Sequence, residues 1–329
     1  MKNAKVSVCI PIYGVEKYIE RCARSLFEQT MTDGIEFIFV NDCTKDKSIE
    51  ILEQVLSDYP QRKEQVKIIH HEENGGLVAA RNTGLKHATG DYIIHCDSDD
   101  WVDLNMYEAM YNKAIETNAD MVYCDYKLEG KKTQNICLKS TLSSAAMLKG
   151  VLDTSIHGSL CNKMFRKKIV KDEKLYTPDH ICLMEDTLRV SQMLLKCNKI
   201  AKCNAPVFYH YQRENNGSYT DVNSYKTCNF YTSCEIVDFL FNCLPQEFQK
   251  DLVGLKGNIL FKAVKHCLLP SKDFRTFWRN DWMAMLKCKG IHIAKRIVLF
   301  FAFIAYVPTA KMCCLLLKLN SMIHRRGEK

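Results

Sequence analysis

Three aspartates stand close together directly after a short apolar run. The run covers residues 92–96, and Asp97, Asp99 and Asp100 follow it. A run of this length that stops in polar residues predicts a buried parallel strand, whose carboxyl end is where α/β sheets bind ligands. Neighbouring carboxylates repel each other unless a cation lies between them, and oxygen ligands suit Mg²⁺ or Mn²⁺. The sequence therefore predicts a divalent-cation site here, with an acidic turn that merely ends a strand as the alternative.

Polar groups also follow two earlier strands. The groups at the three strand ends are Pro11, Ile12, Tyr13 and Glu16 after the first, Asn41 and Asp42 after the second, and Asp97, Ser98, Asp99 and Asp100 after the third. Adjacent parallel strands would bring all of them to one crevice, and such convergence is much less expected by chance than any single acidic turn. A further pair, Glu185 and Asp186, stands at the start of an amphipathic helical pattern, where the helix dipole alone would favour carboxylates.

The elements that must position these residues alternate between strands and helices. Over residues 1–125 the alternation predicts a doubly wound, mostly parallel sheet with right-handed crossovers. Beyond Asp125 a polar stretch at 129–132 predicts a hairpin, and a last strand is expected at 206–211. From about residue 224 the pattern is helical only.

Composition narrows the class of protein. With 329 residues, 47% of them hydrophobic, the chain can bury a large core. The 17 cysteines include no Cys-X-X-Cys pair, which favours a reducing cytoplasm, and the first residues show no cleavable signal peptide. The net charge of +8 is concentrated near the C-terminus, which points to an anionic surface and not to nucleic acid.

Taken in order, these segments resemble the family 2 glycosyltransferases of GT-A fold. The resemblance spans about residues 6–215 and is specific for the fold and for nucleotide-sugar use, but not for one sugar. The matching segments are 8–13, 40–42, 74–76, 80–84, 90–93, 97–100 and 185–186. The resemblance implies a GT-A catalytic domain over 1–220, with a nucleotide-sugar half at 1–125 and an acceptor half at 126–220. An all-helical region then covers 221–329.

The resemblance also implies roles for the nucleotide side of the site. Asp42 would accept the base N–H of uracil beside the ledge formed by 11–13, with an Asx-turn residue that binds no ligand as the alternative. Asp97, next to Ser98, would lie at the ribose or the metal, and Asp99 would bind the metal that bridges the diphosphate. Arg81 would face the nucleotide, with a solvated or salt-bridged helix arginine as the alternative.

On the acceptor side, the resemblance implies that Asp186 is the general base, with Glu185 as the second choice. One direct displacement at the anomeric carbon would invert its configuration. His210 would contact the metal or phosphate and Arg213 the diphosphate, with a rim histidine and an exposed loop arginine as the alternatives. The Gln-X-X-Arg-Trp motif of processive members does not occur, which favours the addition of a single sugar.

The expected function is therefore an inverting, metal-dependent transfer from a UDP-sugar to a saccharide or lipid-linked acceptor in surface polysaccharide synthesis. A catalytically silent nucleotide-sugar-binding module is the alternative. A nucleotidyltransferase is disfavoured because no basic glycine-rich loop follows the first strand.

The C-terminal region is expected to lie on the inner face of the cell membrane without crossing it. The apolar run at 297–307 has eleven residues, about half of the ~20 that a spanning helix needs. Extending it through Lys311 would place a charge inside the bilayer. Short apolar helices flanked by basic residues are typical of an interfacial position, with core helices as the alternative.

Overall fold

The computed structural model describes residues 4–130, 132–140, 142–171, 177, 181, 184–212, 227–266, 268, 279–304, 309 and 312–313. Contacts divide the chain into two units. The first comprises Met1–Met147 and Ser159–Gly217, and the second comprises Leu148–Gly158 and Ser218–Lys329. The segment Leu148–Gly158 thus belongs to the same unit as the C-terminal helices. The predicted division at residue 220 did not include this segment.

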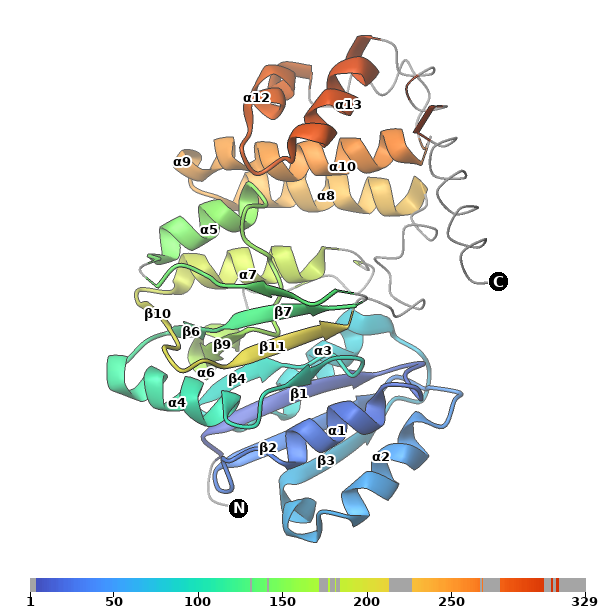
Figure 1. Ribbon diagram of the computed structural model, residues 1–329, viewed down its shortest axis with the longest axis vertical. Coiled ribbons are helices and arrows are strands. Elements are labelled where there is room, and N and C mark those ends of the chain that lie inside the picture. The colour runs from blue at the N-terminus through green and yellow to red at the C-terminus, as the bar shows by residue number, and fades with distance from the viewer. Residues whose placement is uncertain are drawn as a thin grey trace. The chain divides into compact units, whose positions relative to one another are not determined.

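The main sheet of the first unit is mostly parallel (Figure 1). Among the described residues its strands follow the order β10 (Ile200–Lys202), β6 (Met121–Tyr123), β9 (Lys163–Arg166), β4 (Tyr92–His95), β1 (Val6–Ile12), β2 (Ile35–Asn41) and β3 (Val66–His70). The predicted neighbours β4, β1 and β2 are adjacent and parallel. Neighbours among β3, β2, β1 and β4 are parallel, so the chain must cross from the end of one strand to the start of the next, and helices form these crossovers.

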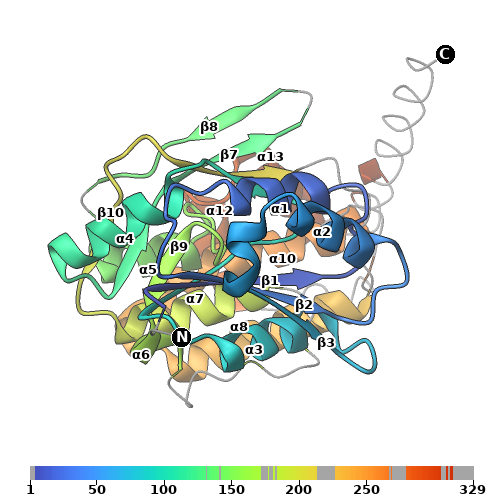
Figure 2. The ribbon, with the colours of Figure 1, turned by 90° about the horizontal axis from the view of Figure 1, so that it is seen from below.

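Helices cover both faces of this sheet. They are α1 (Ile19–Phe27), α2 (Ser48–Ser57), α3 (Gly76–His87), α4 (Met106–Thr117), α6 (Lys167–Val170) and α7 (Glu185–Lys196), with a 3₁₀ turn at Pro60–Gln65. In Figure 2, α1 and α2 lie on one face and α3 on the other. Alternation along β1 explains this, because Val8 and Ile10 join the core beneath α1 while Cys9 packs toward α3. A Cβ at Gly84 would come within 3.0 Å of the Cys9 Cβ, so glycine lets α3 approach β1 closely.

Two features of the first unit go beyond the predicted alternation of strands and helices in a mostly parallel sheet. Strand β9 runs antiparallel to both β4 and β6. A second, smaller sheet has the order β5 (Trp101–Val102), β11 (Phe208–Gln212), β7 (Asp125–Glu129) and β8 (Gln134–Ile136). The predicted hairpin is confirmed as the antiparallel pair of β7 and β8, and β5 continues directly from the acidic residues that end β4.

The second unit is helical in its described residues. Its helices are α8 (Thr227–Cys243), α9 (Gln246–Gln249), α10 (Val253–Lys265), α12 (Trp282–Lys287) and α13 (Ile293–Ile304), with 3₁₀ turns at Lys250–Leu252 and Arg279–Asp281. Helix α5 (Ser144–Leu152) leads into this unit from the first. Within the described part of the chain, no helix combines the length and the apolar character that crossing a membrane requires. The described cysteines are all free thiols.

Candidate active site

The carboxyl ends of β4, β1 and β2 meet at one edge of the main sheet, as predicted. The registers pair Cys9 with His95 and Ile12 with Asn41, so the residues that follow each strand leave the sheet next to one another. Asp42, just after β2, and the loop 97–100, just after β4, therefore lie on either side of β1. We call residues 97–100 the acidic loop.

Asp42 is buried and accepts hydrogen bonds on both carboxylate oxygens. Its Oδ1 receives the N–H of Gly75 at 2.9 Å and lies 2.7 Å from Nδ1 of His71, and its Oδ2 receives the N–H of Gly76 at 2.7 Å. The positive φ of 84° at Gly76 supports this turn, because glycine adopts it without steric cost. Asp42 thus binds the amino end of α3 through N–H groups 33 and 34 residues away, so these bonds are not those of an Asx turn, and the contact with the base stays a prediction.

The other residues predicted beside the base divide into two groups. Pro11 and Ile12 are buried in β1, and the Tyr13 side chain just beyond them is exposed. Glu16 turns toward α2, because its Oε2 accepts the N–H of Lys47 at 3.2 Å. The ledge therefore ends in one exposed aromatic ring, and Glu16 contacts protein backbone.

Within the acidic loop, Asp100 has a different position from its neighbours. It is buried, with Oδ1 accepting the N–H of Gln212 at 2.6 Å and Oδ2 accepting the hydroxyl of Tyr209 at 2.8 Å. The same hydroxyl accepts the N–H of Asp97 at 3.0 Å. Burial raises the pKa of the Asp100 carboxyl well above its usual range, and the charges of Asp99 and Asp97 add to the rise. Asp100 therefore anchors the loop to β11, while the side chains of Asp97 and Asp99 stay partly exposed.

A stack of side chains supports the acidic loop. The guanidinium of Arg21 lies 3.4 Å from the centre of the Trp101 ring, and its Nη2 donates to the carbonyl of Asp99 at 3.3 Å. The ring of His210 also stacks on Trp101, with 5.0 Å between the two ring centres. Arg21, Trp101 and His210 thus tie α1, β5 and β11 together next to the loop.

The position of His210 does not support the metal contact predicted for it. Its Nδ1 lies 2.8 Å from Glu129 and its Nε2 2.9 Å from Asp103. Both ring nitrogens therefore have a carboxylate partner within hydrogen-bonding distance, and a metal ion would have to displace one of these contacts. We therefore leave His210 out of the metal site. Arg213, the other predicted diphosphate contact, lies outside the described residues.

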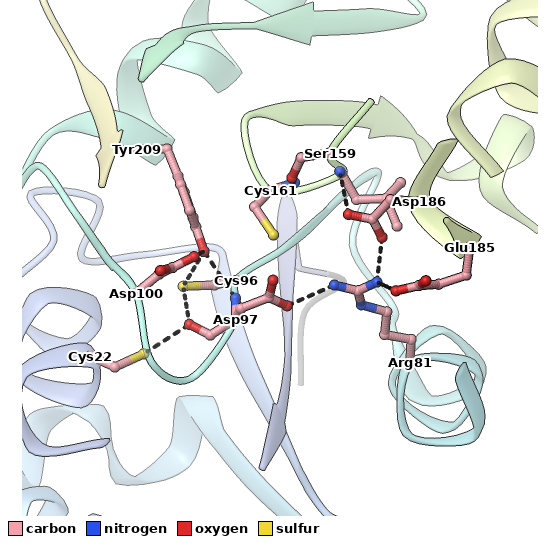
Figure 3. A network of polar contacts seen from close by, with 11 residues as sticks. Cys22, Arg81, Cys96, Asp97, Asp100, Ser159, Cys161, Glu185, Asp186 and Tyr209 are labelled. Atoms are coloured by element: carbon pink, nitrogen blue, oxygen red, sulfur yellow. Dashed lines mark hydrogen bonds and ion pairs between the residues drawn. The ribbon is translucent and has the colours of Figure 1, made fainter. Parts of the chain in front are cut away.

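Arg81 is the centre of a second group of carboxylates (Figure 3). Its Nη2 donates to Oδ1 of Asp97 at 2.7 Å, its Nη1 donates to Oε1 of Glu185 at 2.9 Å, and the same Nη1 donates to Oδ1 of Asp186. The Arg81 side chain is 3% exposed. This arrangement corresponds to the salt-bridged alternative for Arg81, and it joins α3, the acidic loop and α7. We call these residues the Arg81 cluster.

The Arg81 cluster holds more negative than positive charge. Burial opposes the charged form of Arg81, but the three carboxylates outweigh it and raise its pKa well above the usual range. Burial raises the pKa of the Glu185 carboxyl to about 7, with Asp186 adding to the rise and Arg81 opposing it. Burial also raises the pKa of the Asp186 carboxyl, although the charge of Arg81 lowers it in part. A carboxyl whose pKa is raised toward neutrality suits proton transfer near pH 7.

Two buried cations, which the sequence did not single out, lie near the cluster. Lys163 donates to the carbonyl of Ser159 at 2.7 Å, and Arg189 donates to Oδ1 of Asn82 at 2.6 Å. Burial lowers the pKa of Lys163 to about 8 and that of Arg189 to about 10, while the Asp186 carboxylate opposes both shifts. A lysine within the apolar run 160–165 is the signal that identifies the first of them.

The residue before Glu185 has a strained backbone. Met184 has a φ of 63°, a left-handed conformation that costs a residue with a side chain about 1–3 kcal/mol. It stands at the amino end of α7, so the turn that presents Glu185 and Asp186 departs from relaxed geometry. Oδ2 of Asp186 also accepts the N–H of Leu160 at 3.3 Å.

The donor set at the acidic loop fits a divalent cation that arrives with its substrate. In the part of the chain that the structure describes, no three His, Cys, Asp or Glu side chains form a group that could hold a metal ion. Mg²⁺, however, needs only one or two protein carboxylates when substrate phosphates supply further oxygens. Asp97 and Asp99 are the partly exposed carboxylates of this loop, and Oδ1 of Asp97 also accepts from Arg81, whereas Asp100 is buried and bound by Tyr209 and Gln212.

Comparison with known proteins gives consistent matches. A family model described as Glycosyl transferase family 2 matches residues 7–173. The poly(ribitol-phosphate) beta-glucosyltransferase of Bacillus spizizenii is 32% identical over 235 residues, which cover 70% of this chain and 36% of that protein. The chain spans 33–52% of the length of three curated relatives that it matches.

Solved structures share the fold. A crystal structure of S. aureus TarS, residues 1–349, superimposes with a TM-score of 0.63 at 18% identity, covering 96% of this chain and 92% of that one. The same TarS fragment has been solved with UDP-GlcNAc. The mannosyltransferase PcManGT of Pyrobaculum calidifontis, in complex with GDP-Man and Mn²⁺, has a TM-score of 0.53 at 13% identity, covering 92% and 87% of the two chains.

Proposed function

The chain belongs to glycosyl transferase family 2, and from this premise we propose that it transfers one sugar from a UDP-sugar to a saccharide or lipid-linked acceptor. The observation that carries the proposal is the separation of two carboxylate sites at one end of the sheet. Asp42 holds the amino end of α3 at the end of β2 and would bind the base, and the Arg81 cluster joins α3, the acidic loop and α7. A donor nucleotide and an acceptor hydroxyl need two such sites next to each other.

The preference for uridine rests on Asp42. Uracil carries an imide N–H that a carboxylate can accept, whereas cytosine has an acceptor nitrogen at the same position. The complex of TarS with UDP-GlcNAc supports a uridine donor in this fold.

The proposed reaction is a single displacement that inverts the anomeric carbon. The acceptor oxygen forms a bond to that carbon, the bond from the carbon to the diphosphate oxygen breaks, and UDP leaves with the bonding electrons. Asp186 takes the proton of the acceptor hydroxyl, with Glu185 as the alternative base. The raised pKa of Asp186 favours this role, because burial strengthens the carboxylate as a base.

Asp99 and Asp97 would hold a divalent cation, Mg²⁺ or Mn²⁺, in the complex with donor. Such a cation stabilises the negative charge that develops on the leaving diphosphate. Arg81, which contacts Asp97 on one side and Asp186 on the other, would keep the acidic loop and the base at a fixed separation. Tyr209 and Arg21 would hold the loop backbone in place.

We further propose a role in the synthesis of a surface polysaccharide, on the cytoplasmic side of the membrane. The relatives named above include a poly(ribitol-phosphate) glucosyltransferase, which supports a polymeric acceptor. A silent nucleotide-sugar-binding module remains the competing function, since it would use Asp42 without using Asp186.

Nucleoside diphosphate release from a panel of nucleotide sugars, with Mg²⁺ or Mn²⁺ and with or without lipid-linked acceptors, tests the proposal. Release that depends on UDP-sugar, metal and acceptor is expected. Binding of UDP-sugar without release under any of these conditions would favour the silent module. Faster release from CMP- or GDP-sugars would refute the uridine assignment.

Helix α13 supports a membrane-surface position. Its exposed face carries Ile293, Ile297, Phe300, Phe301 and Ile304 at helical spacing. Its basic residues face inward instead, with Lys295 donating to Asn258 at 2.6 Å and Arg296 to the carbonyl of Leu286 at 3.3 Å. We propose that this face binds an anionic lipid surface, helped by the exposed Lys287 and Lys289 just before it. The rest of the predicted apolar region, beyond residue 304, lies largely outside the described residues.

Vesicle sedimentation tests this surface with a double variant, Ile297→Glu with Phe301→Glu. The unaltered protein is expected to sediment with phosphatidylglycerol vesicles and the variant to stay in solution. Ile115→Glu, at an equally exposed isoleucine of α4, is the matched control and should still sediment. A stable dimer that the double variant dissociates, without vesicle binding, would instead identify a protein interface.

A further inference from the structure

The ring of His71 bridges Asp42 and α3. Its Nδ1 lies 2.7 Å from Oδ1 of Asp42, and its Nε2 lies 2.8 Å from the hydroxyl of Thr83. Its backbone N–H also donates to the carbonyl of Asn41 at 2.9 Å. Both the main chain and the side chain of His71 are therefore fixed against the end of β2, in a position that is 18% exposed.

The chemistry of the two partners determines which nitrogen carries the proton. An ionised carboxylate can only accept, so Nδ1 of His71 must donate to Asp42. In the neutral ring Nε2 is then an acceptor, and it receives the hydroxyl hydrogen of Thr83. The contact with Thr83 on α3 thus fixes the orientation of the ring, and the ring in turn fixes the orientation of the Asp42 carboxylate.

Asp42 has few acceptor positions left. A carboxylate offers about four lone-pair positions, and Asp42 fills three of them with His71 and Gly75 on Oδ1 and Gly76 on Oδ2. The remaining position is on Oδ2. Asp42 is only 2% exposed, so water has little access to its oxygens. Because His71 occupies a lone-pair position of Oδ1, the oxygen that can still accept a further hydrogen bond is Oδ2.

We propose that His71 is a positioning residue for base selection, which holds Oδ1 of Asp42 so that Oδ2 meets the imide N–H of uracil. The inference rests on the proposed function, because it needs Asp42 to bind the base of the donor. It adds a residue that does not touch the ligand but sets the preference for uridine over cytidine nucleotides. Loss of its N–H would leave Oδ1 held by Gly75 alone and Oδ2 by Gly76, so the carboxylate would be oriented less firmly.

Two amide variants separate this role from a merely structural one. His71→Asn places an amide nitrogen close to the position of Nδ1, so the donor to Asp42 is kept and the contact with Thr83 is lost. His71→Gln places its amide nitrogen close to the position of Nε2, so the contact with Thr83 is kept and the donor to Asp42 is lost. Both variants remove the ring, and a purely structural role would make their effects alike.

Calorimetry of UDP and CDP binding, with Mg²⁺ or Mn²⁺ present, tests the inference on the full chain. His71→Gln is expected to weaken UDP binding about tenfold, the size of one net hydrogen bond to a charged group, and to reduce the ratio of UDP to CDP affinity. His71→Asn should lose less of both. Thr83→Val, which removes the far contact alone, should lose least, and thermal melts of all variants report their folding.

The outcomes distinguish the two levels of the proposal. If Asp42→Asn leaves the preference for UDP unchanged, the base assignment in the proposed function fails and the role of His71 fails with it. If Asp42→Asn removes the preference but His71→Gln does not, only the role of His71 is refuted. Equal losses in His71→Asn and His71→Gln, with lowered melting temperatures, would also refute it in favour of a structural role.

Discussion

Asp42 is buried and the carboxylates around Arg81 are partly exposed, and their charges are compensated in different ways. Asp42 is satisfied by backbone N–H groups and one histidine that are at most 34 residues away along the chain. The Arg81 cluster instead brings Glu185 and Asp186 to a guanidinium that is 104 and 105 residues away. The Asp42 site is built from neighbouring β–α units, whereas the Arg81 cluster joins segments that are about a hundred residues apart in the sequence.

The difference separates a site suited to binding from a site suited to proton transfer. Asp42 is held by two backbone N–H groups and one histidine ring, which favour a constant geometry. In the Arg81 cluster one guanidinium faces Asp97, Glu185 and Asp186, and burial raises the pKa of both Glu185 and Asp186. Carboxyls that are not fully compensated can take up and release a proton near neutral pH.

The largest effect is expected from Arg81→Met, which removes the only guanidinium in direct contact with these three carboxylates among the described residues. Breaking a buried ion pair on one side costs about 3–5 kcal/mol, and chemical denaturation should report a loss of this order. Arg24→Met is the matched control, since Arg24 pairs with Glu20 and Asp58 at the surface and its loss should change stability little. Equal losses in the two variants would show that the cluster does not hold the fold together.

Asp99→Ala should reduce metal-dependent turnover by about a hundredfold or more, because a charge-stabilising contact to the leaving group is lost. Steady-state release of UDP, measured at several Mn²⁺ concentrations, checks this. Asp91→Ala removes an exposed aspartate just before β4 and should leave turnover close to its original value. Full activity of Asp99→Ala with an intact fold would contradict the placement of the metal at the acidic loop.

The dependence of stability on pH should differ between the protein and Glu185→Gln. The pKa of Glu185 is raised in the folded state to about 7 from 4.5, so its proton stabilises the fold at low pH, and this contribution is lost as the pH rises from about 4.5 through 7. Glu185→Gln lacks this titration, and its melting temperature should fall less over the same interval, by about 2–4 °C for each kcal/mol of difference. Parallel melting curves from pH 4.5 to 7.5 would contradict the raised pKa.

A smaller effect is expected from Tyr209→Phe. The hydroxyl that joins Asp97 and Asp100 is lost, at a net cost of about 1 kcal/mol. Because the loop backbone is then less fixed, the affinity for Mn²⁺ in the presence of UDP should fall several-fold, as measured by titration. An unchanged affinity would indicate that β11 supports the sheet without positioning the acidic loop.

The sequence predicted the local site better than the tertiary one. Asp42 and the acidic loop follow short apolar runs, and the parallel pairing of adjacent strands places them at one edge, as observed. The position of β9 was not predicted, because an antiparallel insertion between β4 and β6 leaves no local pattern. Tyr209 was assigned to a strand without a role, since its partners Asp97 and Asp100 are over 100 residues away.

The same reasoning explains His210 and Arg81. A histidine at the end of an apolar strand fits a metal ligand equally well as a buried ring between two acids, and only the positions of Glu129 and Asp103 decide between them. Arg81 stands on α3 behind a glycine turn, which favours a nucleotide contact, but the side chain reaches Glu185 and Asp186 instead. Periodicity assigns a face to a residue and does not identify its partner.

Donor binding and transfer, measured side by side in Asp42→Asn and Asp186→Asn, test the division between the two sites most directly. Calorimetry gives the dissociation constant of the UDP-sugar, and single-turnover kinetics at saturating donor give the transfer rate. We expect Asp42→Asn to lose mainly affinity, and Asp186→Asn to lose roughly 10²–10⁴ in rate with little change in affinity. If Asp186→Asn weakens donor binding as much as Asp42→Asn and keeps its transfer rate, the division between the sites is wrong.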